Sequence, residues 1–475
     1  MPTIKDSSSI EEVLQYIVAC YGAEIYQEKQ RLSNLIADLY TGEERSKRLY
    51  RRMVMEDAVS PQWYAISLKP IQEREGFYNR LVHQFKEANF YEEAFARQVL
   101  DMFLHGMNLL LVEPISTRAT EEDGEWYDIY GSKYSADQKK LIYAPENLYG
   151  NYRVLDGAVV ICDFAFSNCK DLCEITLPWG IMSIGNEVFD DCKNLKEINI
   201  TKSNKFYRTI DGVLYTKDLK TIICYPQGKK GENFVIPSSV TNIGISSFRG
   251  CRNLRKITLF SSVTSIEDEA FYECENLKEI NIPSSVISIG HQVFSSCRNL
   301  QRINVAESNK FYKTIDGVLY TKDLKTIICY PQGKKGENFV IPSSVTNIGI
   351  NSFSGCSNLR KITLFSSVTS IEDEAFYECE NLKEINIPSS VISIGNGAFS
   401  WCVNLKEITL PSSVTSIGDF AFSDCRNLKE VTLPSSVTSI GDNVFWDLQQ
   451  INIPRGTLEK FKKLLPKWTN ELHEI

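Results

Sequence analysis

The 475-residue sequence has few of the residues that most often carry catalysis, and it has no long apolar run. It contains four histidines, and no G-x-S-x-G, P-loop, H-E-x-x-H or dinucleotide-binding fingerprint occurs in it. A membrane-spanning helix needs about 18 consecutive apolar residues, and the sequence has no such run. These absences predict a protein that is not an enzyme, holds no cofactor or metal, and does not associate with a membrane.

A secretion signal and an excess of positive charge are also missing. The N-terminus has no basic stretch followed by an apolar core, which predicts a cytoplasmic protein. If a leader was removed, the protein is secreted or lies at the cell surface instead. The net charge of −8 argues against nucleic acid as the main ligand.

The sequence repeats itself at two periods. Residues 203–290 recur at 308–395, displaced by 105 positions, with four differences. The differing pairs are Arg208/Lys313, Ser246/Asn351, Arg249/Ser354 and Arg252/Ser357. A shorter period of 23 residues runs inside and after this duplication, as in LKEITLPSSVTSIGDFAFSDCRN at 405–427. Periods of this length predict stacked units that bury their apolar sides against each other, and such stacks favour binding over catalysis.

Each 23-residue unit predicts two short strands and one helical turn. L-x-x-I-x-L alternates apolar and polar residues, V-x-x-I-G is a second extended segment with glycine at a tight corner, and A-F-x-x-C forms the turn. In 405–427 the predicted buried residues are Leu405, Ile408, Leu410, Val414, Ile417, Ala421, Phe422 and Cys425. Nine cysteines share the register of Cys425, which predicts a buried apolar position; a redox-active ladder of thiols is the alternative.

The remaining sequence predicts a helical N-terminal part and an early start of the repeats. Residues 1–119 predict a bundle of helices, one of them within 24–40, and the polar segment 117–126 predicts a linker. The stretch GVLYTKDLKTIICYP occurs at 212–226 and 317–331, and GSKYSADQKKLIYAP at 131–145 matches it in part. This third, degraded copy places the start of the array near residue 125.

These motifs resemble the BspA-type leucine-rich repeat family. The resemblance rests on L-x-x-I-x-L-P-S-S-V-T-S-I-G-x-x-A-F-x-x-C-x-N and on the longer IDGVLYTKDLKTIICYPQGKKGENFVIPSSV. It implies an α+β protein with a curved right-handed solenoid of short parallel strands over 120–455, after an all-helical bundle at 1–119. A C-terminal capping helix at 456–475 is expected to close the stack, because the last coil must be covered. The N-terminal bundle is weakly similar to helical domains appended to bacterial repeat proteins.

Aromatic and lysine side chains of the two long repeats are the candidate protein-binding residues, because aromatics beside cations are typical interface anchors. The candidate residues are Phe206, Tyr207, Tyr215, Tyr225, Lys229 and Lys230, repeated as Phe311, Tyr312, Tyr320, Tyr330, Lys334 and Lys335. The alternative is that the tyrosines pack a hairpin against the solenoid. Two copies would allow bivalent binding of a repeated partner.

The sequence thus predicts a non-enzymatic protein-binding scaffold that acts as an intracellular adaptor or recognition protein. Protein–protein interaction is what the family resemblance implies, and the partner is a protein of unknown identity. Oligomerisation through residues 1–119 is open. Three alternatives remain: a secreted or cell-surface adhesin, an enzyme whose chemistry lies in the N-terminal helical domain with Cys20 as nucleophile, and a purely structural protein that binds no partner.

Overall fold

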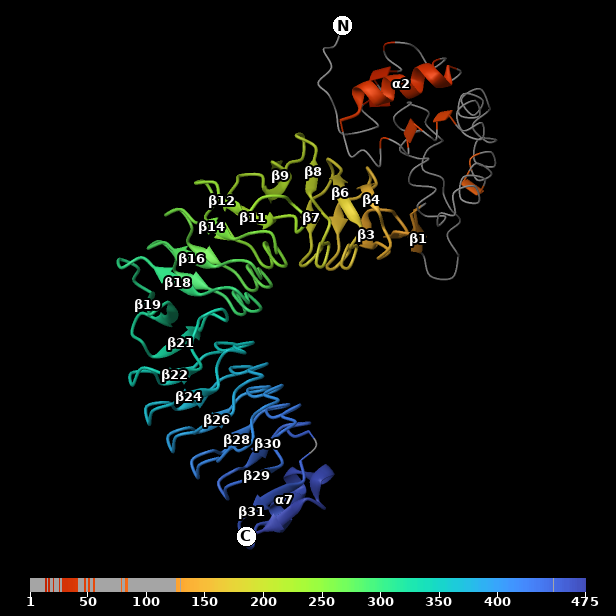
Figure 1. Cartoon of the computed structure of the whole chain (residues 1–475). Helices are drawn as coiled ribbons and strands as arrows, with labels where there is room; N and C mark the ends of the chain where they lie inside the picture. Colours follow the sequence, from red (N-terminus) through yellow and green to blue (C-terminus); the bar gives the residue numbers. More distant parts are fainter. Residues whose placement is uncertain are drawn as a thin grey trace.

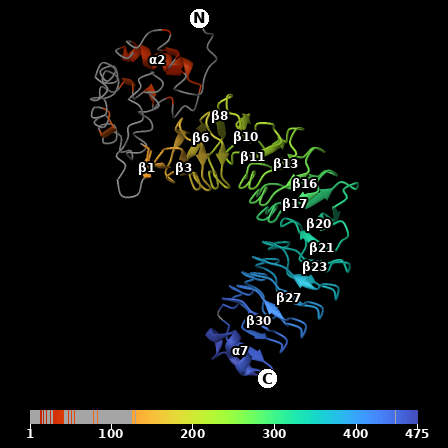
Figure 2. The same ribbon diagram turned by 180° about the vertical axis from the view of Figure 1, so that it is seen from behind.

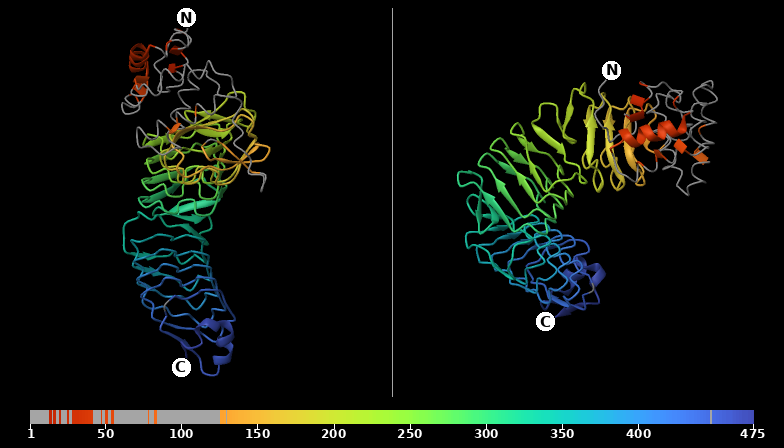
Figure 3. Two further views of the ribbon diagram at one scale, coloured as in Figure 1. Left: turned by 90° about the vertical axis from the view of Figure 1, so that its right-hand side faces the viewer. Right: turned by 45° about the horizontal axis from the view of Figure 1, so that its top comes forward.

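The computed structural model describes residues 28–41, 125–128, 130–446 and 448–475, with single residues and pairs between positions 13 and 83. From residue 125 onward the chain forms a β-solenoid whose coils stack into a curved arc, with β1 at one end and α7 at the other (Figure 1). The same arc is seen from behind and from two further directions (Figures 2 and 3). The predicted curved solenoid of short parallel strands is confirmed.

One helix of the N-terminal part has described bounds. This helix, α2 (Lys29–Leu39), buries Leu32 and Ile36, which stand one turn apart on the apolar stripe that the sequence predicts. The other helices expected in 1–119, and most of the linker expected at 117–126, lie outside the described residues, so the bundle remains a prediction.

The solenoid consists of three segments, each of which begins with antiparallel strands and continues with parallel ones. The first segment contains β1 (Glu125–Tyr127), β2 (Lys133–Ser135), β3 (Lys140–Tyr143), β4 (Gly150–Arg153), β5 (Val160–Ile161), β6 (Leu172–Leu177), β7 (Ser183–Ile184) and β8 (Glu197–Ile200). The second contains β9 (Tyr207–Ile210), β10 (Val213–Thr216), β11 (Thr221–Cys224), β12 (Asn233–Val235), β13 (Asn242–Ile243), β14 (Lys256–Thr258), β15 (Ser265–Ile266), β16 (Glu279–Ile282), β17 (Ser288–Ile289) and β18 (Arg302–Val305).

The third segment repeats the second and then extends it to the C-terminus. It contains β19 (Tyr312–Ile315), β20 (Val318–Thr321), β21 (Thr326–Cys329), β22 (Asn338–Val340), β23 (Asn347–Ile348), β24 (Lys361–Thr363), β25 (Ser370–Ile371), β26 (Glu384–Ile385), β27 (Ser393–Ile394), β28 (Ser416–Ile417), β29 (Glu430–Thr432), β30 (Ser439–Ile440) and β31 (Gln450–Ile453). The chain ends with α7 (Leu458–Leu464), the 3-10 helix η2 (Pro466–Trp468) and β32 (Leu472–Glu474).

The antiparallel strands of the long repeats separate the apolar cores of successive segments. Among the described residues from β1 onward, buried apolar side chains form three cores. On β10, Leu214 packs into the core of the first segment, whereas its neighbours Val213 and Tyr215 pack into that of the second. A strand buried on both faces needs apolar residues at successive positions, which explains the run VLY and the run TIIC. The strands β1, β2 and β3 have the same order and pairing, which confirms the degraded third copy.

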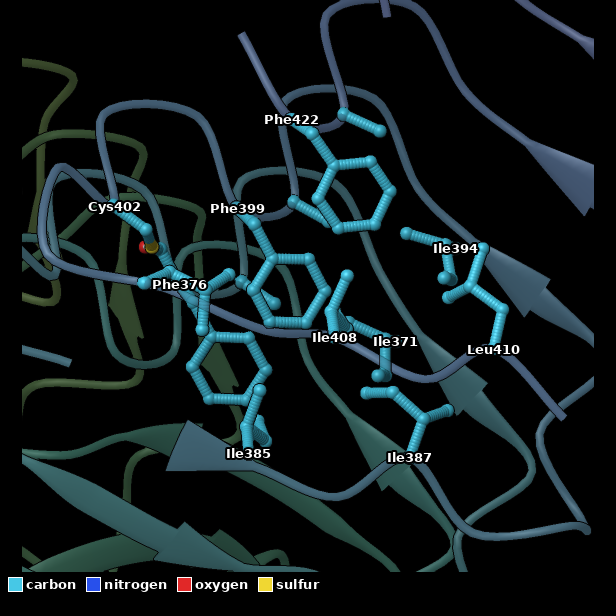
Figure 4. Close-up of a cluster of buried hydrophobic side chains, with 14 of the residues drawn as sticks. Ile371, Phe376, Ile385, Ile387, Ile394, Phe399, Cys402, Ile408, Leu410 and Phe422 are labelled. Carbon is cyan, nitrogen blue, oxygen red and sulfur yellow. The ribbon is translucent and has the colours of Figure 1, made fainter. Parts of the chain in front are cut away.

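The regular coils pair in a register that equals the 23-residue period. Ile257 of β14 lies opposite Ile280 of β16, and Ile266 of β15 lies opposite Ile289 of β17. Identical positions therefore stack on one another along the core. Within each segment the phenylalanines of these turns form a row of stacked rings, part of which Figure 4 shows for the third segment, with centroids 5.1 Å apart between Phe376 and Phe399. All eight residues predicted to be buried in 405–427 are buried.

The glycine of each I-G corner is required by the closeness of the neighbouring coil. A Cβ atom added to Gly418 would lie 2.5 Å from the amide nitrogen of Asn396 in the preceding coil. The corner glycines Gly395, Gly418 and Gly441 are not among the residues with positive φ, whereas Phe420, two residues after Gly418, has a φ of 55°. The expectation that glycine serves the bend through its conformational freedom is therefore corrected: it serves the contact between coils.

The repeated cysteines are buried thiols that hydrogen-bond to the preceding coil. Sγ of Cys379 lies 3.1 Å from the carbonyl oxygen of Phe353, and Sγ of Cys402 lies 3.2 Å from that of Phe376. All fourteen cysteines are described, and none forms a disulfide. Burial raises the pKa of Cys379 to about 12, so its thiol stays protonated and can donate. The predicted buried position is confirmed, and the thiol also fills a specific hydrogen-bonding role.

The helix of the C-terminal cap is shorter than predicted, and the cap also includes a strand. Within 456–475, α7 places Phe461 in the core, and the ring of Trp468 meets that of Phe445 at a centroid distance of 6.1 Å. β32 then pairs in parallel with β31 and so extends the sheet by one strand. The last apolar coil is thus covered as expected. Among the described residues, no helix is long and apolar enough to cross a membrane.

A carboxyl group buried near the start of the solenoid should make stability depend on pH. Asp128 accepts hydrogen bonds from the backbone amides of Tyr130 and Ser132 and from the hydroxyl of Tyr152, at 2.9, 2.8 and 2.5 Å. Burial raises the pKa of Asp128 to about 6. The folded protein therefore binds this proton at a pH where the unfolded chain has lost it, and the contribution of Asp128 to stability falls as pH rises from 4 to 6.

Replacement of Asp128 by asparagine is expected to remove this dependence. Between pH 4.5 and pH 7, the free energy of unfolding of the wild type should fall by about 2 kcal/mol relative to D128N. Urea unfolding of both proteins at the two pH values measures the difference. Parallel pH profiles for the two proteins would contradict the assignment.

Candidate functional site

Each long repeat forms a β-hairpin at the edge of a sheet. In the second segment β9 runs antiparallel to β10, with Tyr207 opposite Thr216 at one end and Ile210 opposite Val213 at the other. β10 pairs in turn with β11. The third segment repeats this with β19, β20 and β21. β9 and β19 are the terminal strands of their sheets, so one edge of each pairs with no strand among the described residues.

Four of the eight candidate aromatics lie in the core and not at the surface. Tyr215 and Tyr225 are 1% and 3% exposed, and Tyr320 and Tyr330 have the same values. The ring of Tyr225 stacks on that of Phe248 at 5.3 Å and so begins the phenylalanine row of its segment. Burial raises the pKa of the hydroxyl groups of all four. Their position favours the alternative that the tyrosines pack the hairpin against the solenoid.

Tyr207 and Tyr312, at the start of the two hairpins, each contact the last strand of the parallel sheet that precedes the hairpin. The hydroxyl oxygen of Tyr207 accepts a hydrogen bond from the amide of Ile184 in β7, at 3.2 Å. Tyr312 does the same for Ile289 in β17, at 2.9 Å. β7 and β17 are the last strands of their ladders, so each hydroxyl satisfies an amide that the next coil leaves unpaired.

Two of the four candidate lysines are bound to an aspartate, and the other two are exposed. Nζ of Lys229 donates to the carbonyl oxygen of Asp211 at 2.6 Å, and Lys334 makes the equivalent bond to Asp316, also at 2.6 Å. Each of these two lysines also forms an ion pair with the carboxylate of the same aspartate. Lys230 and Lys335, by contrast, are exposed.

An exposed stripe along each hairpin includes residues that the candidate set omits. Phe206 is 45% exposed and precedes β9, on which Arg208 and Ile210 are also exposed. Alternate residues of a strand share a side, so these three side chains form one surface. The third segment repeats it with Phe311, Lys313 and Ile315. We call these two surfaces the hairpin faces; the period-two alternation of F-Y-R-T-I is the sequence signal for them.

A buried asparagine holds the chain ahead of each hairpin, and no motif in the sequence distinguishes it from the other asparagines. Asn309 is 1% exposed, and its Oδ1 accepts hydrogen bonds from the amides of Phe311 and Tyr312, both at 2.8 Å. Its Nδ2 donates to the carbonyl oxygens of Pro283 and Val286 in the preceding coil, at 3.1 and 2.9 Å. Asn204 makes equivalent contacts in the second segment.

A cleft lies at each junction between segments. The first cleft, of about 160 Å³, lies between the turn after β7 and the strand β11. The second, of about 220 Å³, lies between the turn after β17 and the strand β21. Two of the four differences between the duplicated copies, at positions 246/351 and 249/354, line these clefts. Half of the differences between the duplicated copies therefore lie where the clefts form.

One guanidinium group joins the two walls of the first cleft. Arg249, on the second segment, forms ion pairs with Asp190 at 2.8 Å and Glu187 at 3.6 Å across the junction. It also pairs with Glu269 on its own side, and its guanidinium carbon lies 4.3 Å from the centroid of the Tyr272 ring. Burial raises the pKa of the Glu269 carboxyl, and the charge of Arg249 opposes this rise.

Across the part of the chain that the structure describes, no three His, Cys, Asp or Glu side chains stand close enough to hold a metal ion. The described surface instead presents exposed apolar, cationic and acidic side chains.

The sequence profile of the BspA type leucine rich repeat region matches residues 151–230, 222–335 and 329–452. The chain belongs to this family. The BspA-type assignment agrees with the two parallel ladders, the A-F-x-x-C turns and the hairpin-forming long repeats described above. No curated protein matches the chain.

Several solved structures are similar to this BspA-type protein. A leucine rich cell surface protein from Faecalibacterium prausnitzii is 26% identical, with a TM-score of 0.51, over 73% of this chain and 98% of the other. A leucine-rich repeat protein from Eubacterium ventriosum is also 26% identical, with a TM-score of 0.36, over 63% and 64%. The pneumococcal vaccine antigen PcpA is 20% identical, with a TM-score of 0.45, over 74% and 96%.

Proposed function

We propose that this protein is a non-enzymatic scaffold that binds a protein partner through the hairpin faces. The observation that supports this most directly is the pair of hairpin faces. Each carries an exposed phenylalanine, a cation and an exposed isoleucine along an edge strand whose outer side pairs with no described strand. Exposed aromatic and aliphatic side chains beside a cation suit the centre of a protein interface, and an open strand edge can add backbone hydrogen bonds.

Duplication of the face favours a partner that itself has two equivalent sites. The second hairpin face copies the first with one conservative change, Arg208 to Lys313, at a fixed distance set by the intervening coils. Two linked contacts strengthen each other when the geometry lets both form at once. Lys230 and Lys335 lie in the same long repeats and are exposed, so we retain them in the proposed surface.

Photo-crosslinking of the full chain tests the proposal. Benzoylphenylalanine placed at Phe206 or Phe311 should give discrete crosslinked species in cells that produce the protein. The matched controls are Ile287 and Ile392, which are both 54% exposed and stand 105 residues apart on ordinary coils. Equal crosslinking at the control positions, or none at the hairpin faces, would refute the assignment.

Two cellular locations are candidates for the interaction with the partner: the cytosol and the cell surface. The sequence predicts an intracellular adaptor, whereas the similarity to a cell surface protein of Faecalibacterium prausnitzii supports the adhesin alternative. Fractionation of the same cells before crosslinking separates the two: crosslinked species in the cytosolic fraction support the adaptor, and species at the surface support the adhesin.

A further inference from the structure

The two hairpins are basic parts of an acidic protein. Residues 203–230 contain six lysine and arginine residues against two aspartates, and residues 308–335 contain the same numbers, so each stretch has a net charge of +4. The whole chain, by contrast, has a net charge of −8. Both stretches therefore run counter to the charge of the rest of the protein, and their field attracts an anionic ligand to the hairpins.

Most of these cations have no carboxylate of their own. Lys229 and Lys334 are the exceptions, since they pair with the aspartates of the hairpin loops. Within the described part of the chain, no carboxylate forms an ion pair with Arg208 or Lys313, the central cations of the two hairpin faces. A carboxylate of a partner can therefore meet these cations without displacing one that belongs to the protein.

The outer edge of each hairpin presents backbone groups that another strand can bind. Asp211 and Gly212 form the two-residue loop between β9 and β10, with φ of 50° and 69°. A hydrogen-bonded pair flanks such a loop, and bonded and non-bonded pairs then alternate along the hairpin. The bond from the amide of Lys217 to the carbonyl oxygen of Phe206, at 2.7 Å, fits this alternation. The amide and carbonyl of Thr209 therefore point away from β10, and β19 repeats the arrangement.

The exposed side of β9 determines which side chains suit a strand that pairs with it. Arg208 stands between Phe206 and Ile210 on this side. Residues that lie opposite each other in neighbouring strands share a side of the sheet and contact each other. A complementary strand thus has an acidic residue opposite Arg208 and apolar residues two positions before and after it. The third segment presents the same order, with lysine in place of arginine.

We propose that the partner of the hairpin faces is an acidic, extended segment of a protein, with the pattern apolar–x–acidic–x–apolar, which adds as a strand to β9 or β19. The inference rests on the proposed protein-binding role and adds the chemistry of the partner. The open edge selects a polypeptide, because only a polypeptide strand forms backbone hydrogen bonds to it, and the central cation selects the acidic residue.

Fluorescence anisotropy with the full chain and the labelled peptide TVTETVT tests the inference. The wild type should bind TVTETVT at least about tenfold more tightly than TVTKTVT, because the central residue has the opposite charge to the hairpin cation in one peptide and the same charge in the other. A third peptide, TVTTEVT, has the composition of the first but places its glutamate on the other side of the strand. It should bind about fivefold or more weakly than TVTETVT.

Charge reversal on the protein gives a result that misfolding cannot imitate. Arg208→Glu combined with Lys313→Glu should invert the preference, so that TVTKTVT binds at least about tenfold more tightly than TVTETVT. Lys278→Glu combined with Lys383→Glu is the matched control. These two lysines are exposed, stand 105 residues apart on ordinary coils, and change the net charge by the same amount. The control should keep the preference of the wild type.

Equal binding of TVTETVT and TVTKTVT, equal binding of TVTETVT and TVTTEVT, or equal losses in the two double variants would overturn the inference. Heparin, an oligothymidylate, or vesicles of phosphatidylserine and phosphatidylcholine in equal parts supply negative charge without a strand. Tighter binding of any of these than of TVTETVT, lost in R208E/K313E, would overturn the assignment to a polypeptide.

The crosslinking experiment keeps this inference separate from the proposed function. Crosslinks at Phe206 and Phe311 together with no preference among the peptides would refute the partner chemistry alone. A preference among the peptides without crosslinks in cells would refute the proposed role instead.

Discussion

Replacement of Asn309 by alanine is expected to destabilise the junction between the second and third segments by about 4 kcal/mol or more. The side chain satisfies two carbonyl oxygens of the preceding coil and two amides of its own hairpin, and all four groups lose their partner in the variant. Each buried polar group left without a partner costs about 1–3 kcal/mol. Water that enters the space recovers part of this free-energy cost, so the expected destabilisation lies near the lower limit for four groups.

Hydrogen exchange is the measurement that locates this effect. In N309A, amide protection should fall first in β17 and in the hairpin of β19 and β20, because a repeat stack is coupled mainly between neighbouring coils. Asn304→Ala is the matched control, since Asn304 donates at its side chain only to the exposed Asn281, at 2.9 Å. Protection in N309A equal to that in the control would show that the four bonds contribute little.

Truncation of Phe399 should produce the other large loss, of about 3–5 kcal/mol. The ring is fully buried and lies between those of Phe376 and Phe422, at centroid distances of 5.1 and 5.3 Å (Figure 4). Removal of the ring leaves a cavity that the two neighbouring coils cannot fill, since each is held by its own strand pairs. Urea unfolding of Phe399→Ala against the wild type measures the loss.

The control for Phe399 is a phenylalanine of the same chain that lies in a turn. Phe365 is 41% exposed, and its replacement by alanine should change the free energy of unfolding by less than about 1 kcal/mol. A similar loss in both variants would mean that the core is loosely packed and that the ring row has no special role.

The repeat sequence predicted the regular coils in detail because their structure is local and periodic. A 23-residue period sets the register of both ladders, so the buried positions of 405–427 followed directly from alternation along the unit. The long repeats were harder to interpret. Tyrosine is a residue type common at interfaces, yet Tyr215 and Tyr225 lie in the core because the strands that carry them are covered on both sides. Only the packing of one segment against the next decides this.

The candidate residues of the sequence analysis and the proposed hairpin faces overlap only in part. Phe206 and Phe311 are exposed as an anchor requires, whereas Arg208, Ile210 and their equivalents were omitted from the predicted set. Asn309 and Arg249 act through partners that are 23 to 59 residues distant in the sequence. Such contacts form across a junction between segments, where the periodic pattern stops and gives no register.

The sequence by itself determined the family, the coil, the register of the ladders and the buried row of phenylalanine and cysteine, because identical units stacked on each other must repeat the same contacts. The tertiary structure alone decided the corner role of glycine, the division into three cores and the two clefts. These features depend on distances between coils and between segments, which no single unit encodes. Two of the four differences between the duplicated copies lie at these clefts, and there the ion pairs of Arg249 with Glu187 and Asp190 have no equivalent, because Ser354, Gln292 and Ser295 stand at the corresponding positions.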